Sequence, residues 1–380
     1  MLIVIRNSAS NEERARLLAL LDQIIVSERP IATIRIGERE VIALESSLLD
    51  AQACTTIRHA DAVERLLPIQ TAYKLVSRAF KATQSTIVAG DALGGQPVVI
   101  GGAHPVIIAG PCAVESREQL LTTVRAAKAA GAQLLRGGAF TPRASPYQFQ
   151  RLGVEGLHLL AEAREEAGLP VVAEVMEPEL VEAVSHYADV LEIGSGNMHN
   201  VPLLRTVGQN SYLRPVLLTR GLAATIDEWL LAAEFIVAAG NPNVILCERG
   251  IRSFDPETRN LLDLSCVPLL HAQTHLPVLV DPSHATRRRE LVPALSRAAL
   301  AAGAQGLLLA VHPDPNRAVF DGHLSITPAQ LHWIARDSRL ITAVLQEPET
   351  VLQTLERMED EQLRTGHRVY DGSARLESDR

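Results

Sequence analysis

The most regular pattern in the chain is a series of eight short apolar segments between residues 105 and 311. Most of them are separated by stretches with helical apolar spacing, such as Ser116–Ala130 and Thr225–Ala239. Strands that alternate with helices predict a parallel sheet, and eight repeats in about 240 residues predict a closed (β/α)8 TIM barrel over residues 105–348. An open doubly wound sheet is the alternative, but no glycine-rich dinucleotide fingerprint follows any segment. The segments are Pro105–Ala109, Gln133–Arg136, Pro170–Glu174, Val190–Gly194, Pro215–Thr219, Val244–Glu248, Pro277–Asp281 and Gly306–Val311.

The chain before the barrel has a mixed pattern, in which alternating and helical apolar spacing follow one another. This mixture predicts a small ferredoxin-like α+β domain over residues 1–80. Residues 81–104 are rich in glycine and strand formers and predict a connecting hairpin, whereas the charged residues 349–380 predict a C-terminal tail. The elements expected in the small domain are strands at Leu2–Arg6, Ile31–Gly37 and Arg39–Glu45, and helices at Asn11–Val26 and Ala60–Leu67.

The composition of the chain argues against several classes of function. The formal net charge is −8, and no basic stripe with interleaved aromatics occurs, so nucleic acid is not an expected partner. No run approaches the ~18 apolar residues of a membrane span, so no membrane association is expected either. The four cysteines show no close pairing, which favours a reduced, cytoplasmic setting. No lysine follows Lys128, and this excludes a Schiff-base aldolase mechanism that uses a lysine at a barrel strand end.

Chemistry in a (β/α)8 barrel is found where the strands end and the loops begin. Polar and ionisable residues gather at these points throughout the chain. The strand-end motifs are GPCAVE (110–115), LRGGAFTPRASPY (135–147), AEV (173–175), IGSGN (193–197), LTRG (218–221), LCERGIR (246–252), VDPSH (280–284), LAVHP (309–313) and FDG (320–322).

This set of motifs, together with YKLVSRAF (73–80), resembles the type Iβ family of DAHP synthases (3-deoxy-D-arabino-heptulosonate 7-phosphate synthases). The resemblance runs from the small domain to about residue 340. It implies an enzyme that uses a divalent metal to join phosphoenolpyruvate to erythrose 4-phosphate, at the start of the shikimate pathway of aromatic amino acid biosynthesis. It also implies that the small domain binds a regulatory amino acid.

The resemblance implies a metal site of four ligands, of which this sequence has three. Cys112, His284 and Asp321 stand at the positions of the family's cysteine, histidine and aspartate. The family's glutamate belongs to an EVHP motif that reads AVHP here, with Ala310 in its place. Open divalent sites commonly use three protein ligands, so we expect Mn, Fe, Co or Zn to bind, but less tightly than in the family.

The anion-binding positions implied by the resemblance are only partly retained. Arg136 stands where the family holds the phosphoenolpyruvate carboxylate, and Arg249 stands at one of three positions that hold its phosphate. The other two positions are occupied by Gly196 and Thr219 in place of an arginine and a lysine. Thr141 replaces the lysine of a KPR motif, which is the expected proton donor.

Two further positions match the family. Arg143 and Ser145 stand where the aldose phosphate is bound, and His312 is expected to be either a proton relay or a residue that supports the ligands. The expected substrate is therefore a small anionic molecule.

Other polar residues have plainer interpretations. HAQTH (271–275) lacks a metalloprotease glutamate and predicts surface histidines rather than a zinc site. Glu174 and Glu248 predict ion pairs with arginines, and Asp281 is placed to orient a neighbouring ligand. The run of arginines at 287–289 predicts a solvated face, from which one side chain could reach an anion.

Three functions fit these residues. The first is a repurposed metal-assisted carbon–carbon bond-forming enzyme of the aldolase type, which acts in specialised metabolism on a keto acid or phosphorylated small molecule other than the standard pair. The second is a non-catalytic homologue that binds or regulates a pathway enzyme. The third is a conventional DAHP synthase. The resemblance implies a homo-oligomer in each case.

Overall fold

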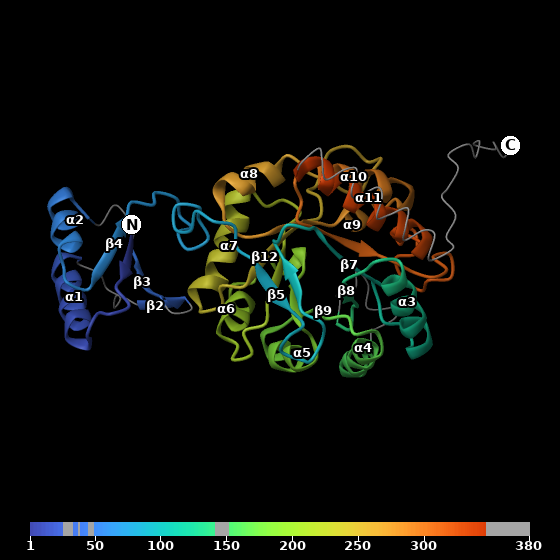
Figure 1. The fold of residues 1–380 in the computed structure, drawn as a ribbon, viewed down its shortest axis with the longest axis horizontal. Helices are drawn as coiled ribbons and strands as arrows, with labels where there is room; N and C mark the ends of the chain where they lie inside the picture. Colours follow the sequence, from blue (N-terminus) through green and yellow to red (C-terminus); the bar gives the residue numbers. More distant parts are fainter. Residues whose placement is uncertain (26–32, 37–38, 45–48, 141–151, 347–380) are drawn as a thin grey trace.

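The computed structural model describes residues 1–25, 33–36, 39–44, 49–140 and 152–346, and Figure 1 shows its two parts. A closed parallel barrel surrounded by helices forms the larger part, and a four-stranded α+β domain lies beside it. The N-terminus belongs to the small domain, whose two helices lie on the side of its sheet away from the barrel.

Every predicted apolar segment of the barrel forms a strand, which confirms the TIM barrel. Neighbouring strands are parallel, and the pairing of the last strand with the first closes the sheet. Because these strands are covered on both faces, most of their residues are apolar. The strands are β7 (Val106–Gly110), β8 (Leu134–Arg136), β9 (Val171–Glu174), β10 (Val190–Ile193), β11 (Val216–Thr219), β12 (Val244–Glu248), β13 (Val278–Val280) and β14 (Gly306–Ala310).

Helices on the outside of the barrel connect the strands, and polar caps define where several of them begin. Thr225 and Glu228 form a reciprocal capping box at the start of α7, and Ser116 caps α3. No helix in the described part of the chain is long and apolar enough to cross a membrane. The helices are α3 (Arg117–Ala129), α4 (Val154–Ala167), α5 (Val181–Tyr187), α6 (Val201–Gln209), α7 (Ile226–Ala238), α8 (Cys266–Gln273), α9 (Pro282–Thr286), α10 (Val292–Ala301) and α11 (Pro328–Gln346), with 3-10 turns η2 (Pro178–Leu180), η3 (Ser195–Asn197) and η4 (Arg289–Leu291).

The interior of the barrel is a packed apolar core that is closed at the N-terminal end of the strands. The predicted connecting hairpin is present as β5 (Ile87–Ala89) and β6 (Val98–Ile100), and it packs with the inward residues of the strands. Its backbone approaches the barrel so closely that a Cβ on Gly90 would lie 2.5 Å from Cγ of Pro170. With this end filled, the opposite end of the barrel is left for chemistry.

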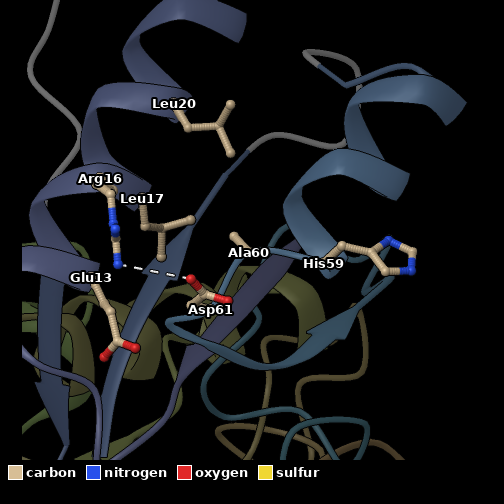
Figure 2. Close-up of a pocket in the computed structure, with 7 residues that line it drawn as sticks. All are labelled: Glu13, Arg16, Leu17, Leu20, His59, Ala60 and Asp61. Atoms are coloured by element: carbon tan, nitrogen blue, oxygen red, sulfur yellow. Dashed lines mark ion pairs between the residues drawn. The ribbon is translucent and has the colours of Figure 1, made fainter.

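The small domain has the ferredoxin-like fold. Its sheet order is β2-β3-β1-β4, and both β3 and β4 are antiparallel to β1. Figure 2 shows a pocket on its helical side, whose lining residues all belong to this domain. The elements are β1 (Leu2–Ile5), α1 (Asn11–Ile24), β2 (Thr33–Ile36), β3 (Arg39–Ala43), α2 (Ala51–Arg58) and β4 (Val63–Leu67).

One predicted element of this domain is wrong. The sequence pattern predicts a helix at Ala60–Leu67, but the helix is Ala51–Arg58 and residues 63–67 form strand β4. Asp50 caps the helix by accepting a hydrogen bond from the backbone N–H of Ala53, which places the helix earlier in the chain. The apolar segment after the helix is short enough to form either a helix or a strand. It forms a strand because it pairs with β1.

Polar contacts fix the segment that connects the two parts of the molecule to the barrel. The Glu234 carboxylate of α7 accepts hydrogen bonds from the backbone N–H groups of Leu75 and Val76, at 2.9 and 3.1 Å. His275 lies against the same segment, with Nε2 at 2.8 Å from the Leu75 carbonyl and Nδ1 at 2.8 Å from the Ser85 hydroxyl. The prediction of a surface histidine is therefore wrong for His275, which is buried.

The buried imidazole of His275 predicts a loss of stability in mild acid. Burial, supported by the charges of Lys81 and Arg78, lowers the pKa of His275 to about 4, below its ordinary value of about 6.5. Its stabilising contribution is thus complete above about pH 6.5 and is lost as the pH falls towards 4.

We expect the free energy of unfolding of the native chain to fall by about 2–3 kcal/mol more than that of His275→Gln between pH 7 and pH 4.5. Denaturant unfolding at both pH values measures this difference. The exposed His104 provides the control, because His104→Gln should keep the pH dependence of the native chain. Equal pH dependence in the native chain and His275→Gln would contradict the expectation.

Candidate active site

Three side chains that are far apart in the sequence meet at the C-terminal end of the barrel. Cys112 follows β7, His284 lies in α9 after β13, and Asp321 lies in the loop after β14. The thiol, an imidazole nitrogen and a carboxylate oxygen all lie within 4.8 Å of one another. Cys112 and His284 are buried, whereas Asp321 is half-buried. We refer to these three residues as the triad.

The orientation of His284 is set by Asp281. The Asp281 carboxylate caps α9 by accepting a hydrogen bond from the His284 backbone N–H at 2.9 Å. Its second oxygen accepts from Nδ1 of the same imidazole at 2.6 Å. Nε2 is left at 3.5 Å from the Cys112 thiol. Asp281 therefore does what the sequence predicted, since it directs one nitrogen of the ring into the triad.

The charges of this pair are strongly coupled. Burial alone would lower the pKa of His284, but the Asp281 carboxylate and Cys112 raise it to about 9. Burial alone would raise the pKa of Asp281, but the imidazole holds it at about 2. A positive charge is thus favoured inside the triad at neutral pH, and either a proton on His284 or a metal cation can supply it.

The donor atoms of the triad fit a divalent transition metal. A thiolate, an imidazole and a carboxylate are typical ligands of zinc and related ions, and three of them leave a position open for water or substrate. Ala310, at the family's glutamate position, is fully buried and packs with Cys112, Phe320 and Leu324. That side of the site is apolar, so the residues fit an ion that is held by three protein ligands.

A buried arginine faces the triad from the end of β8. Nη1 of Arg136 lies 3.5 Å from Nε2 of His284, and Nη2 lies 3.6 Å from a Glu192 oxygen of β10. Burial opposes the charge of Arg136, but Glu192 and Cys112 raise its pKa further above its ordinary value. Nε is buried and has no hydrogen-bond partner within the described residues. A substrate carboxylate could bind here through charge-assisted hydrogen bonds.

Next to Arg136, the ends of β10, β11 and β12 form a corner. This corner lacks two cationic side chains that the family resemblance implies there. Arg249 donates a hydrogen bond to the Ser195 hydroxyl at 3.3 Å. Nothing lies within 4 Å of the point where a Cβ of Gly196 would be, so a side chain could begin there without a clash. Thr219 is buried, and its hydroxyl has no partner in the described part of the chain. The neighbouring Arg220 does not compensate, because it pairs with Glu248 and Asp263, each at 3.0 Å.

The other predicted site residues are placed less completely. His312 is buried, Nδ1 accepts a hydrogen bond from the Asp314 backbone N–H, and Nε2 has no partner among the described residues. This leaves Nε2 available for proton exchange, as a relay requires. Thr141, Arg143 and Ser145 lie outside the described residues.

Glu192 is a site residue that the sequence interpretation missed. It lies in the apolar segment VLEI, whose pattern predicts only a buried strand. A charged residue inside such a segment needs a partner, and here the partner is Arg136. The isolated glutamate in the segment is the signal by which it could have been found. The ion pair predicted for Glu248 is present, with Arg220.

The fold and the site together define a class, namely a TIM-barrel protein whose C-terminal rim gathers metal-ligand side chains and arginines. A model of the DAHP synthetase I family matches residues 79–347. The phospho-2-dehydro-3-deoxyheptonate aldolase of Thermotoga maritima is 42% identical over 333 residues, which are 86% of this chain and 93% of the relative. The chain therefore belongs to the DAHP synthetase I family.

A further relative and a solved structure are also similar over most of their own length. A 2-dehydro-3-deoxyphosphooctonate aldolase of Syntrophotalea carbinolica is 30% identical over 275 residues, covering 67% of this chain and 98% of the relative. The crystal structure of the DAHP synthase from T. maritima superimposes with a TM-score of 0.68 and 38% identity, covering 90% of this chain and 97% of that one. The family uses a divalent metal, and the triad is the set of residues here that fits it.

We expect one divalent ion to bind per chain through the triad. Titration of the metal-free protein with Co²⁺ should produce a thiolate–cobalt charge-transfer band, because Cys112 contributes a sulfur ligand. Cys112→Ser should abolish the band, whereas Cys54→Ser, a change in the small domain, should keep it. Equal spectra for the native chain and Cys112→Ser would contradict this assignment.

Proposed function

We propose that this protein forms a carbon–carbon bond by a metal-assisted, aldol-type reaction of an anionic keto acid or phosphorylated small molecule. Phosphoenolpyruvate with erythrose 4-phosphate is not its preferred pair. One observation carries the proposal. The ligand atoms of the triad converge and His284 is oriented by Asp281, whereas the adjoining corner at Gly196 and Thr219 lacks the cations that would hold a phosphate there.

Each retained residue has a role in this proposal. Cys112, His284 and Asp321 would hold the divalent ion, which when bound would polarise a carbonyl oxygen and stabilise developing negative charge. Arg136 would bind the carboxylate of the substrate. Its ion pair with Glu192 of β10 would keep the guanidinium in place.

The proton that the reaction needs must come from a group other than a lysine. Thr141 stands where the family has its lysine proton donor, and a threonine hydroxyl does not replace an ammonium group at neutral pH. His312 is a suitable donor, because its Nε2 has no partner in the described part of the chain.

The missing cations argue against the standard pair. A charge-assisted hydrogen bond contributes about 1.5–3 kcal/mol, so the loss of three cations lowers affinity for phosphoenolpyruvate by about a thousandfold or more. The three positions are Thr141, Gly196 and Thr219. No lysine in the second half of the chain can replace them.

A conventional DAHP synthase is the second candidate, favoured by the 42% identity to the T. maritima relative over most of the chain. A non-catalytic, partner-binding role is less well supported, because it gives no reason for the converging ligand atoms. Self-association and a cytoplasmic location stay predictions.

The two enzyme candidates differ in a direct assay. We expect the metal-loaded protein to release phosphate from phosphoenolpyruvate and erythrose 4-phosphate at less than a tenth of the ~10 s⁻¹ that is typical of enzymes. Turnover within tenfold of that value would establish the conventional activity instead. If turnover is low, a thermal-shift screen of keto acids should identify a ligand that stabilises the native protein but not Cys112→Ser.

Restoring the missing groups should restore part of the family's reaction. The variant Thr141→Lys, Gly196→Arg, Thr219→Lys, Ala310→Glu rebuilds the carboxylate contact, the phosphate contacts and the fourth metal ligand. Because the four groups act on one substrate and one ion, single changes should have almost no effect, whereas the quadruple variant should show measurable condensation. Adding Cys112→Ser to that variant should remove the activity again. A folded, metal-binding quadruple variant with no activity would show that these positions do not explain the difference.

A further inference from the structure

Asp321 is the member of the triad that lies on a loop. Cys112 comes two residues after the end of β7, and His284 lies in α9, where Asp281 orients it. Asp321, in contrast, is separated from the end of β14 by residues 311–320. Its φ is 54°, in the left-handed region that residues other than glycine rarely adopt. A side chain on such a loop needs contacts from other elements if it is to keep a fixed position.

Glu115 makes such a contact from the loop after β7. Its Oε1 accepts hydrogen bonds from the backbone N–H groups of Val319 at 2.9 Å and Phe320 at 3.3 Å, the two residues before Asp321. Val319 is 65% exposed, so water could satisfy its N–H, and the carboxylate is not needed for that purpose. The contact instead fixes the position of the backbone that leads into Asp321. Glu115 also lies three residues after Cys112, so one loop carries one ligand and positions another.

Arg289 contacts the loop on the other side of Asp321. Its Nη2 donates a hydrogen bond to the Gly322 carbonyl at 3.0 Å and a weaker one to the Asn316 side chain at 3.3 Å. Its backbone N–H donates to the His323 carbonyl at 3.1 Å. The prediction of a solvated face is therefore wrong for Arg289, whose guanidinium binds the loop backbone. The residues before and after Asp321 are both held from outside the loop.

We propose that Glu115 is a positioning residue for the metal centre, which keeps Asp321 within reach of the ion by holding the two residues before it. Arg289 supports the same loop from the following side. This inference rests on the metal centre of the proposed function, but not on its substrate or its reaction. Because Ala310 provides no fourth ligand, an Asp321 that moves away would leave the ion with two protein ligands.

The role assigned to Glu115 depends on an acceptor oxygen and not on charge. The amide oxygen of Glu115→Gln can accept the same two hydrogen bonds, whereas Glu115→Ala removes the acceptor. In a titration of the metal-free protein with Co²⁺, Glu115→Ala should weaken binding by about fivefold or more, and Glu115→Gln by less than about twofold. The exposed Glu118 provides the matched control, because Glu118→Ala removes a carboxylate three residues away and should change the affinity by less than about twofold.

A double-mutant cycle shows whether Glu115 acts through Asp321. Asp321→Ala removes the ligand itself, so adding Glu115→Ala to it should weaken Co²⁺ binding no further. At saturating Co²⁺ the thiolate band of Glu115→Ala should persist, because Cys112 stays in place. The thermal midpoint of the metal-free variant reports whether it folds. If Glu115→Ala does not fold, Arg289→Ala enters the same cycle and should weaken binding in the same direction.

Equal Co²⁺ affinity in Glu115→Ala and Glu118→Ala would overturn this inference and leave the metal centre standing. Additive effects of Glu115→Ala and Asp321→Ala would also overturn it, since Glu115 would then act elsewhere. Failure of the native chain to bind Co²⁺ would reject the metal centre and this inference together. A protein that binds Co²⁺ with the expected cycle but forms no carbon–carbon bond would support this inference and reject only the proposed function.

Discussion

The hydrogen bond between Asp281 and Nδ1 of His284 determines much of the geometry at the rim. At 2.6 Å between a buried carboxylate and a buried imidazole, it fixes which ring nitrogen is left for a ligand. The opposite nitrogen then lies 3.5 Å from both the Cys112 thiol and the Arg136 guanidinium. Barrel closure brings the strand ends together, but this contact turns a set of nearby side chains into an oriented site.

Around that contact, positive charge is distributed unevenly. Arg136 is buried and balanced by Glu192 on one side of the triad. The corner beyond it has an open space at Gly196 and a hydroxyl at Thr219, where the family resemblance implies cations. On the other side, Arg287 pairs with a carboxylate of the triad and lies near other arginines. The site thus combines three converging side chains that could ligate a metal with an arginine on each side, and it lacks cations in the corner beyond Arg136.

The barrel was predictable because its strands are largely apolar segments followed by polar residues, and the triad because the motifs at the strand ends resemble those of a known family. Contacts between distant segments were not predictable. Residues 63–67 form a strand through pairing with β1, and His275 is buried by a segment about 200 residues earlier in the chain. The isolated glutamate in its apolar segment marks Glu192 as a residue that needs a partner, but that partner, Arg136, lies on another strand and is not given by any local pattern. The open space around Gly196 likewise depends on how distant segments pack, so the sequence pattern does not give it.

Cys112, His284 and Asp321 are expected to form a three-ligand metal centre without a carboxylate at Ala310. Anomalous diffraction from crystals grown with Mn²⁺ tests it directly. We expect one strong peak, bonded at about 2.0–2.4 Å to the Cys112 sulfur, Nε2 of His284 and an Asp321 oxygen. The Ala310 side should contribute no protein ligand. A peak at another set of residues, a fourth protein ligand, or no peak at saturating Mn²⁺ would contradict a three-ligand centre.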